Sequence, residues 1–142
     1  MRLIPVPFVF VALVVCVHAR ATTLQYDRPV GIVGTLTERR GVDCCTYGKQ
    51  SEVSYPAVEL DRPIDVELAA GAPPDETAVT EVGVTLIHLV IAKKEHWAAF
   101  RARIGKRARV QCSLFHAHTG HHQTPVLCEV RGISGAQGFR EP

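Results

Sequence analysis

The chain has 142 residues and carries 16 lysines and arginines against 14 aspartates and glutamates. This length suits one small domain with a core large enough to fold unaided. Removal of an expected signal segment containing Arg2 and Arg20 leaves 14 basic and 14 acidic residues, and this neutrality argues against bulk electrostatic attraction to nucleic acid.

Residues 1–21 have the pattern of a secretory signal peptide. Arg2 forms the positive start, residues 3–17 are almost wholly apolar, and the small-x-small sequence A-R-A ends at Ala21. The apolar run is shorter than the about 20 residues that a helix needs to cross a bilayer. We therefore expect cleavage after Ala21, no membrane span in the mature form, and a periplasmic or secreted location.

A lipid anchor on Cys16 is the alternative to cleavage after Ala21. Val15 stands before this cysteine, where a lipoprotein signal has a small residue. The sequence therefore favours cleavage.

Charge is divided unevenly along the expected mature chain. Residues 22–92 carry five basic and eleven acidic side chains, whereas residues 93–142 carry nine basic and three acidic ones. The basic cluster within residues 93–109 could meet an anionic partner. We interpret it as a solvated face that complements the acidic half.

The first expected strand covers residues 30–36, where Ile32, Gly34 and Leu36 share one face. A glycine inside a strand indicates a bulge or a close backbone approach. Residues 37–54 are polar and read as a long connection that holds Cys44 and Cys45. Such a connection within a compact domain is usually functional or disordered.

A second strand is expected over residues 55–66 and a third over residues 79–91, separated by a loop. In the second, one face is apolar and residues 61–63 indicate a bend or bulge. In the third, His88 shares a face with Val82, Val84, Leu86 and Val90. A hydrogen-bonded core histidine is a simpler interpretation of His88 than a ligand.

Residues 92–104 predict a short helix, because Trp97, Phe100 and Ile104 recur at spacings of three and four. Gly105 is the expected stop. We interpret Trp97 as a core anchor rather than a stacking platform.

Residues 105–130 read as a β-hairpin, the richest stretch in the chain. From Ala108 an alternating inward set would include Cys112, His116 and His118, and the return strand would begin near Val126. If the turn centres on Gly120, Cys112 faces Cys128, Leu114 faces Val126, and His118 faces His122.

The run GKRARVQCSLFHAHTGHHQTPVL resembles the C-terminal signature of an uncharacterised bacterial family of small exported domains of unknown function. In that family a GK-basic-V strand leads into LFHAHTGHHHTPVLL, and the resemblance weakens towards the N-terminus. This chain has Cys112, Gln123 and Cys128 where the family tends to have glycine, histidine and leucine. The resemblance implies architecture and export but no activity, and it suggests a cysteine pair particular to this protein.

Three strands, a helix and two strands form the element order of a small five-stranded OB-fold-like barrel. We place this mainly β domain at residues 22–134, followed by a flexible tail at residues 135–142. In an OB-fold the loops between strands one and two and between strands four and five flank the ligand face. Here these loops would carry Cys44-Cys45 and the histidines, so the two stretches are expected to converge.

The histidines suggest a metal site. His116, His118 and His122 would point to one side of the hairpin and His121 to the other. Three imidazole nitrogens suit zinc or copper, and three nitrogens with a water form an open zinc geometry. The alternative is that the histidines only make turn and inter-strand hydrogen bonds.

Four cysteines remain after cleavage, and an even number in an oxidising compartment suggests disulfides. The hairpin register favours a Cys112–Cys128 bond. Cys44 and Cys45 would then form a vicinal bond, stay reduced, or act as soft metal ligands. Buried free thiols are the simpler alternative for Cys112 and Cys128.

The chain contains no serine elbow, HExxH helix, phosphate loop or Cys/His nucleophile pattern. The sequence therefore favours a non-enzymatic binding module for a protein, peptide or glycan. The alternatives are a metal carrier or zinc-dependent enzyme that uses the histidines, and a secreted inhibitor or immunity-type protein. A zinc hydrolase would also need a general base, and the sequence offers no clear one.

Overall fold

The computed structural model describes residues 21–46, 49–71 and 79–136. The expected signal peptide, the rival lipid anchor and most of the expected tail lie outside these residues. The described elements follow the order β1 (Thr22–Gln25), β2 (Pro29–Thr46), β3 (Lys49–Glu67), β4 (Glu81–Val90), α1 (Lys94–Arg101), β5 (Arg107–His116) and β6 (Val126–Gly135).

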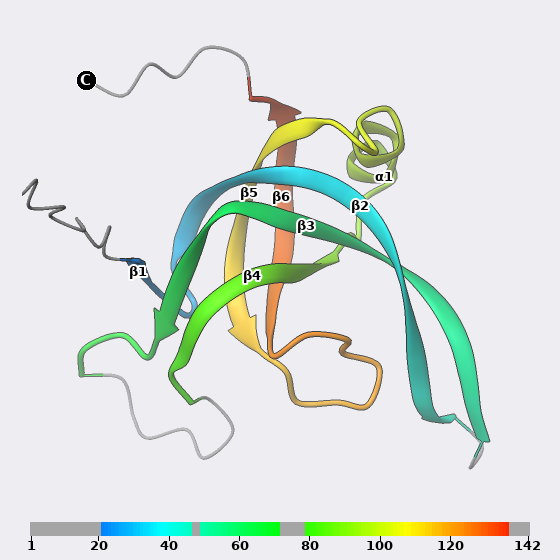
Figure 1. Cartoon of the computed structure of the whole chain (residues 1–142), viewed down its shortest axis with the longest axis horizontal. Helices are drawn as coiled ribbons and strands as arrows, with labels where there is room; N and C mark the ends of the chain where they lie inside the picture. The colour runs from blue at the N-terminus through cyan, green and yellow to red at the C-terminus, as the bar shows by residue number, and fades with distance from the viewer. Residues whose placement is uncertain (1–20, 47–48, 72–78, 137–142) are drawn as a thin grey trace, which may run out of the picture.

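Five of the strands close into a barrel, as the sequence predicts (Figure 1). Neighbours around the wall are β3, β2, β5, β6 and β4, and β4 pairs again with β3. The β4–β6 pair is parallel and the other four pairs are antiparallel. This strand order, with the helix between β4 and β5, is that of an OB-fold. Strand β1 is an addition that the sequence did not indicate, and it pairs in parallel with the end of β3.

The barrel interior is filled by the alternating apolar residues of the strands. Leu36, Val58, Val110 and Leu114 are completely buried. Phe100 of α1 is also buried against this core, and Trp97 packs beside it with its indole N–H donating to the Ile91 carbonyl oxygen at 2.9 Å. The helix therefore packs onto the core, as its apolar stripe predicts, although Ile104 lies beyond its end and is 41% exposed.

At Gly34 the backbones of β2 and β3 approach each other closely. Gly34 pairs with Leu60, and a Cβ placed on it would overlap the Glu59 carbonyl oxygen and lie 2.9 Å from the Leu60 Cα. The close backbone approach predicted from a glycine within this strand is confirmed. Only a residue without a side chain fits here.

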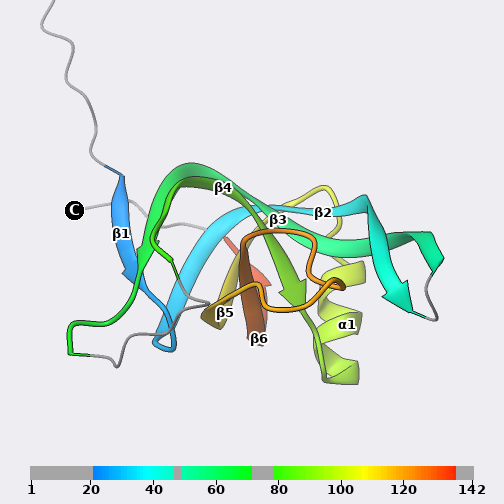
Figure 2. The same cartoon turned by 90° about the horizontal axis from the view of Figure 1, so that it is seen from below.

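The prediction of a long loop at residues 37–54 is wrong. Strands β2 and β3 continue through it as a ladder that runs from Gly34–Leu60 to Asp43–Ser51 and beyond. The outer half of this hairpin, residues 37–46 and 49–57, is called the arm below, and it projects past the barrel (Figures 1 and 2). Most of its outer residues are solvent-exposed on both faces, so the sequence lacks the apolar alternation by which a strand is recognised.

The face predicted for β4 also needs correction. Ile87 and Leu89 are the residues buried in the core, whereas Val82 is 76% exposed and His88 lies on the outer side. The cause is the irregular pairing of β4 with β3, in which Glu59 faces Leu86 but Ile64 faces Val84. This irregularity is the bulge predicted at residues 61–63, and it changes which residues of β4 point inward.

In the part of the chain that the structure describes, no helix is both long and apolar enough to span a bilayer.

Candidate functional site

Strands β5 and β6 are joined by residues 117–125, here called the histidine loop. The predicted register is wrong by two residues, because Leu114 pairs with Cys128 and His116 with Val126. The loop closes with a hydrogen bond from the Ala117 N–H to the Pro125 carbonyl oxygen at 2.8 Å. A nine-residue loop therefore replaces the tight turn on Gly120. Because the shift is even, the same strand residues still point inward.

Cys112 and Cys128 form a disulfide, with 5.5 Å between their Cα atoms. Both side chains are buried, at 1% and 0% exposure. Their predicted proximity on adjacent strands is thus confirmed, although they are not directly opposite. Cys44 is also disulfide-bonded, and the Cys45 side chain lies outside the described residues.

The histidine loop is fastened to the arm mainly by the side-chain amide of Gln123. Its Oε1 accepts from the Val42 N–H at 3.0 Å, and its Nε2 donates to the Val42 carbonyl oxygen, also at 3.0 Å. The same Nε2 lies 3.1 Å from the His121 carbonyl oxygen. Gly41 makes room for this amide, since a Cβ there would collide with Gln123 Oε1.

Two further contacts extend this junction. His121 Nδ1 lies 2.6 Å from Asp43 Oδ1, and the Cys44 N–H donates to the Gly120 carbonyl oxygen at 3.4 Å. The predicted convergence of the Cys44-Cys45 stretch with the histidines is therefore confirmed. The role of Gln123 was missed by sequence reasoning, and its departure from the third histidine of the resembling family was the signal that could have revealed it.

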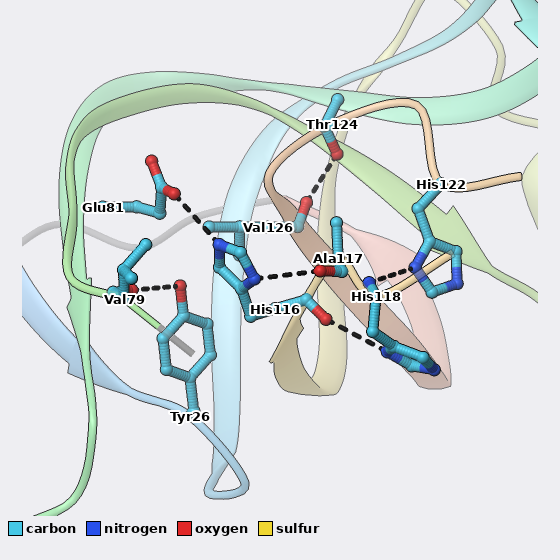
Figure 3. A network of polar contacts seen from close by, with 9 residues as sticks. All are labelled: Tyr26, Val79, Glu81, His116, Ala117, His118, His122, Thr124 and Val126. Atoms are coloured by element: carbon cyan, nitrogen blue, oxygen red, sulfur yellow. Dashed lines mark hydrogen bonds and ion pairs between the residues drawn. The ribbon is translucent and has the colours of Figure 1, made fainter. Parts of the chain in front are cut away.

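His118, His122 and Phe115 form an aromatic cluster at the base of the loop. The two imidazole centroids are 4.7 Å apart, and Phe115 lies 5.5 Å from His122. The His118 N–H donates to His122 Nδ1 at 3.1 Å (Figure 3). Burial, followed by the charges of His118 and His121, lowers the pKa of His122 from its ordinary value. This cluster consequently favours a neutral His122.

His116 belongs to a separate polar cluster on the other side of the loop (Figure 3). Its Nδ1 faces the Ala117 carbonyl oxygen at 3.0 Å, and its Nε2 faces Glu81 Oε1 at 3.1 Å. Buried Tyr26 stands edge-on to it and donates its hydroxyl to the Val79 carbonyl oxygen at 3.2 Å. Burial, with the nearby charge of Glu81, raises the pKa of Tyr26 to about 12.

The structure brings His118 and His122 together but turns His116 away from them. Among the described residues, no group of three His, Cys, Asp or Glu side chains is arranged to hold a metal ion. In a neutral His122 the ring proton lies on Nε2, because Nδ1 accepts a hydrogen bond and therefore carries no proton. Metal binding by His116, His118 and His122 together would need a rearranged loop. Elemental analysis of the purified protein tests the predicted metal site.

His88 lies beneath the same loop and is hydrogen-bonded, as predicted, although on the outer side of β4. The backbone N–H of His88 donates to Thr124 Oγ1 at 3.0 Å, and its ring Nδ1 accepts from the backbone N–H of Gln123 at 3.4 Å. The Tyr55 ring lies 4.9 Å away, between centroids. Burial, followed by the charge of His122, lowers the pKa of His88 to about 4.

His88 is expected to make the fold sensitive to acid. Between about pH 6.5 and 4 the unfolded chain binds a proton that the folded His88 rejects, so its stabilising contribution is lost as the pH falls through this window. Urea unfolding of the wild type and of His88→Gln at pH 7 and pH 4.5 measures this. The variant should lose less stability on acidification than the wild type. An unchanged acid response in His88→Gln would contradict the assignment.

Residues 86–134 match the family model described as Domain of unknown function (DUF4431). The matched segment begins within β4 and ends within β6, so it contains α1, the histidine loop and both cysteines of the Cys112–Cys128 bond. It leaves out the arm to which the histidine loop is attached. No curated protein and no solved structure matches the chain.

Proposed function

We propose that this protein is an exported, non-enzymatic binding module that recognises a protein, peptide or glycan through its arm and histidine loop. The observation that carries the proposal is the Gln123–Val42 junction, which joins two segments 81 residues apart in the sequence. The combined surface, here called the arm–loop face, occupies the position at which OB-folds commonly bind ligands.

The arm–loop face offers the mixed chemistry of a recognition surface. Val42 is 48% exposed, His118 and His121 are exposed, and the half-buried Phe115 stands against His118. Apolar and aromatic groups beside hydrogen-bonding side chains are what a macromolecular partner uses. The hydrogen bonds between arm and loop fix both segments beforehand, which reduces the entropy lost on binding.

The proposed export is compatible with the position of the first strand. Strand β1 starts at Thr22, directly after the expected cleavage site, and Thr22 pairs with Ile64 of β3. Cleavage after Ala21 would leave this strand whole. N-terminal sequencing of protein recovered from the producing cell should read TTLQ, whereas an uncleaved Met1 or a lipid-modified Cys16 would overturn the assignment.

Site-specific photo-crosslinking tests the binding face. A benzophenone amino acid is placed at Val42 or at His118, and an exposed position on β6, Arg131, serves as the control. In cells that produce the protein, both face positions should give the same discrete adduct, and the control should not. Equal adducts at Arg131, or none at Val42 and His118, would reject the face. An adduct with an enzyme would favour the inhibitor alternative.

A further inference from the structure

A groove lies between the base of the arm and α1, on the face of the arm that points away from the histidine loop. Figure 2 shows α1 below the part of β2 and β3 at which the arm begins. Tyr55 lies on the loop side of β3, against His88, so its neighbours Ser54 and Pro56 point the other way and line the groove. The groove has a volume of about 290 Å³.

The floor of the groove is apolar because the inner face of the barrel continues onto the arm. Val58 is completely buried, and the next residue of β3 on the same face, Pro56, lines the groove. From the helix side, Phe100 and Ile104 line it, and Ile104 is 41% exposed. The groove is therefore the place where the apolar interior becomes accessible beside the helix.

Trp97 is shared by this groove and by a second hollow of about 420 Å³ beside it. Its ring is held by the hydrogen bond from Nε1 to the Ile91 carbonyl oxygen and by an edge-on contact with Phe100, 6.0 Å between centroids. The indole therefore packs on the core and also presents part of its ring to solvent, in an orientation that is fixed beforehand.

Two cations stand beside the indole. Lys94 lines the second hollow, and Arg101 lines both, with its guanidinium carbon 5.9 Å from the centroid of the Trp97 ring. In the part of the chain that the structure describes, neither cation lies within ion-pair distance of a carboxylate. This end of the groove therefore attracts an anionic group.

A single carboxylate lines the arm side of the groove, that of Glu38. Its Oε1 accepts a hydrogen bond from the Ser54 hydroxyl at 2.7 Å. Among the described residues, no cation lies within ion-pair distance of it. Because an ionised carboxylate can accept about four hydrogen bonds, Glu38 can receive further hydroxyl donors from a ligand.

We propose that this groove binds an acidic sugar unit of a glycan, with its carboxylate at Arg101, its hydroxyl groups donating to Glu38 and its C–H face on Trp97. A guanidinium pairs with a carboxylate through two parallel hydrogen bonds. The negative face of an aromatic ring attracts the weakly positive C–H groups of a sugar.

The size of the groove favours a sugar over other anions. Its volume is close to the lower limit of about 300 Å³ for small-molecule sites, so one compact unit must carry the anion, the donors and the apolar face. A hydrocarbon anion has no donor for Glu38, and an acidic peptide spreads these groups along its chain. The groove is separate from the arm–loop face, and the inference does not rest on the function proposed for that face.

Tryptophan fluorescence of the protein, produced from the full sequence, tests this site, because Trp97 is the only tryptophan in the chain. The ligands are trigalacturonate, the neutral trisaccharide maltotriose, and the peptide triglutamate, which has the same net charge as trigalacturonate. Trigalacturonate should change the emission saturably and bind at least about tenfold more tightly than either of the others. Equal binding of triglutamate or of maltotriose, or no change with trigalacturonate, would overturn the proposal.

Two variants and a control locate the bound sugar, and all three retain Trp97. Arg101→Gln removes the charge beside the indole, and Glu38→Ala removes the hydroxyl acceptor. Each should weaken binding of trigalacturonate at least about fivefold, since each removes hydrogen bonds to a charged group. Arg131→Gln removes an equal charge on β6, outside the groove, and should leave binding unchanged. Unaltered affinity in Arg101→Gln, or tighter binding by Glu38→Ala, would reject the assigned contacts.

Discussion

Replacing Gly34 by valine is expected to destabilise the fold by about 3 kcal/mol or more. The new side chain would overlap the Glu59 carbonyl oxygen and crowd the Leu60 Cα, which are both backbone atoms of the neighbouring strand. Relief requires β2 and β3 to separate where the arm leaves the barrel. The energy of such overpacking is larger than that of a typical surface change because the backbone itself must move.

Urea unfolding measures the effect of Gly34→Val, which should lower the midpoint by more than about 1 M. Gly31→Ala is the matched control, since it lies on the same strand and its Cβ would approach only the ends of Arg109 and Gln111. The control should stay close to the wild-type midpoint. If both glycine variants retained wild-type stability, the close approach at Gly34 would be refuted.

Loss of the Cys112–Cys128 disulfide is expected to cost about 3 kcal/mol, since the bond closes a loop of 16 residues in the unfolded chain. The test measures how much dithiothreitol lowers the free energy of unfolding of the wild type and of the Cys112→Ala, Cys128→Ala double variant. Any bond made by Cys44 is present in both proteins, so its reduction cancels. The wild type should lose about 3 kcal/mol more than the variant. Equal losses would show that the bond does not contribute to stability.

The barrel could be predicted from the sequence because its strands bury one face and expose the other. Leu36, Val58 and Val110 follow that alternation, and the structure buries all three. The arm could not be predicted in the same way. From the Arg40–Ser54 pair outward the two strands are paired outside the core, and mostly exposed residues on both faces leave no periodic signal there. The face of β4 was misread because a bulge in β3 shifts the pairing of its neighbour.

The candidate site was predicted in part. The disulfide and the convergence of the arm with the histidines follow from the strand order and from which residues of each strand point inward. Neither changes when the predicted register is wrong by an even number of residues. The grouping of His116 with His118 does not follow. His116 is the last residue of β5 and faces Glu81, while His118 already lies in the loop. The residue at which the loop begins depends on tertiary contacts, such as the hydrogen bonds made by the Gln123 amide. The residue pattern of one strand does not reveal these contacts.

The central claim is that Gln123 holds the arm and the histidine loop together as one binding face, and photo-crosslinking from Val42 in a Gln123→Ala background tests it most directly. The variant loses both hydrogen bonds to Val42, at about 1 kcal/mol each, while the barrel retains its core and disulfide. The account predicts that the adduct seen from Val42 falls at least about fivefold in Gln123→Ala. Gln111→Ala, an amide truncation on the outer side of β5, should leave it unchanged. An undiminished Val42 adduct in folded Gln123→Ala would contradict the account.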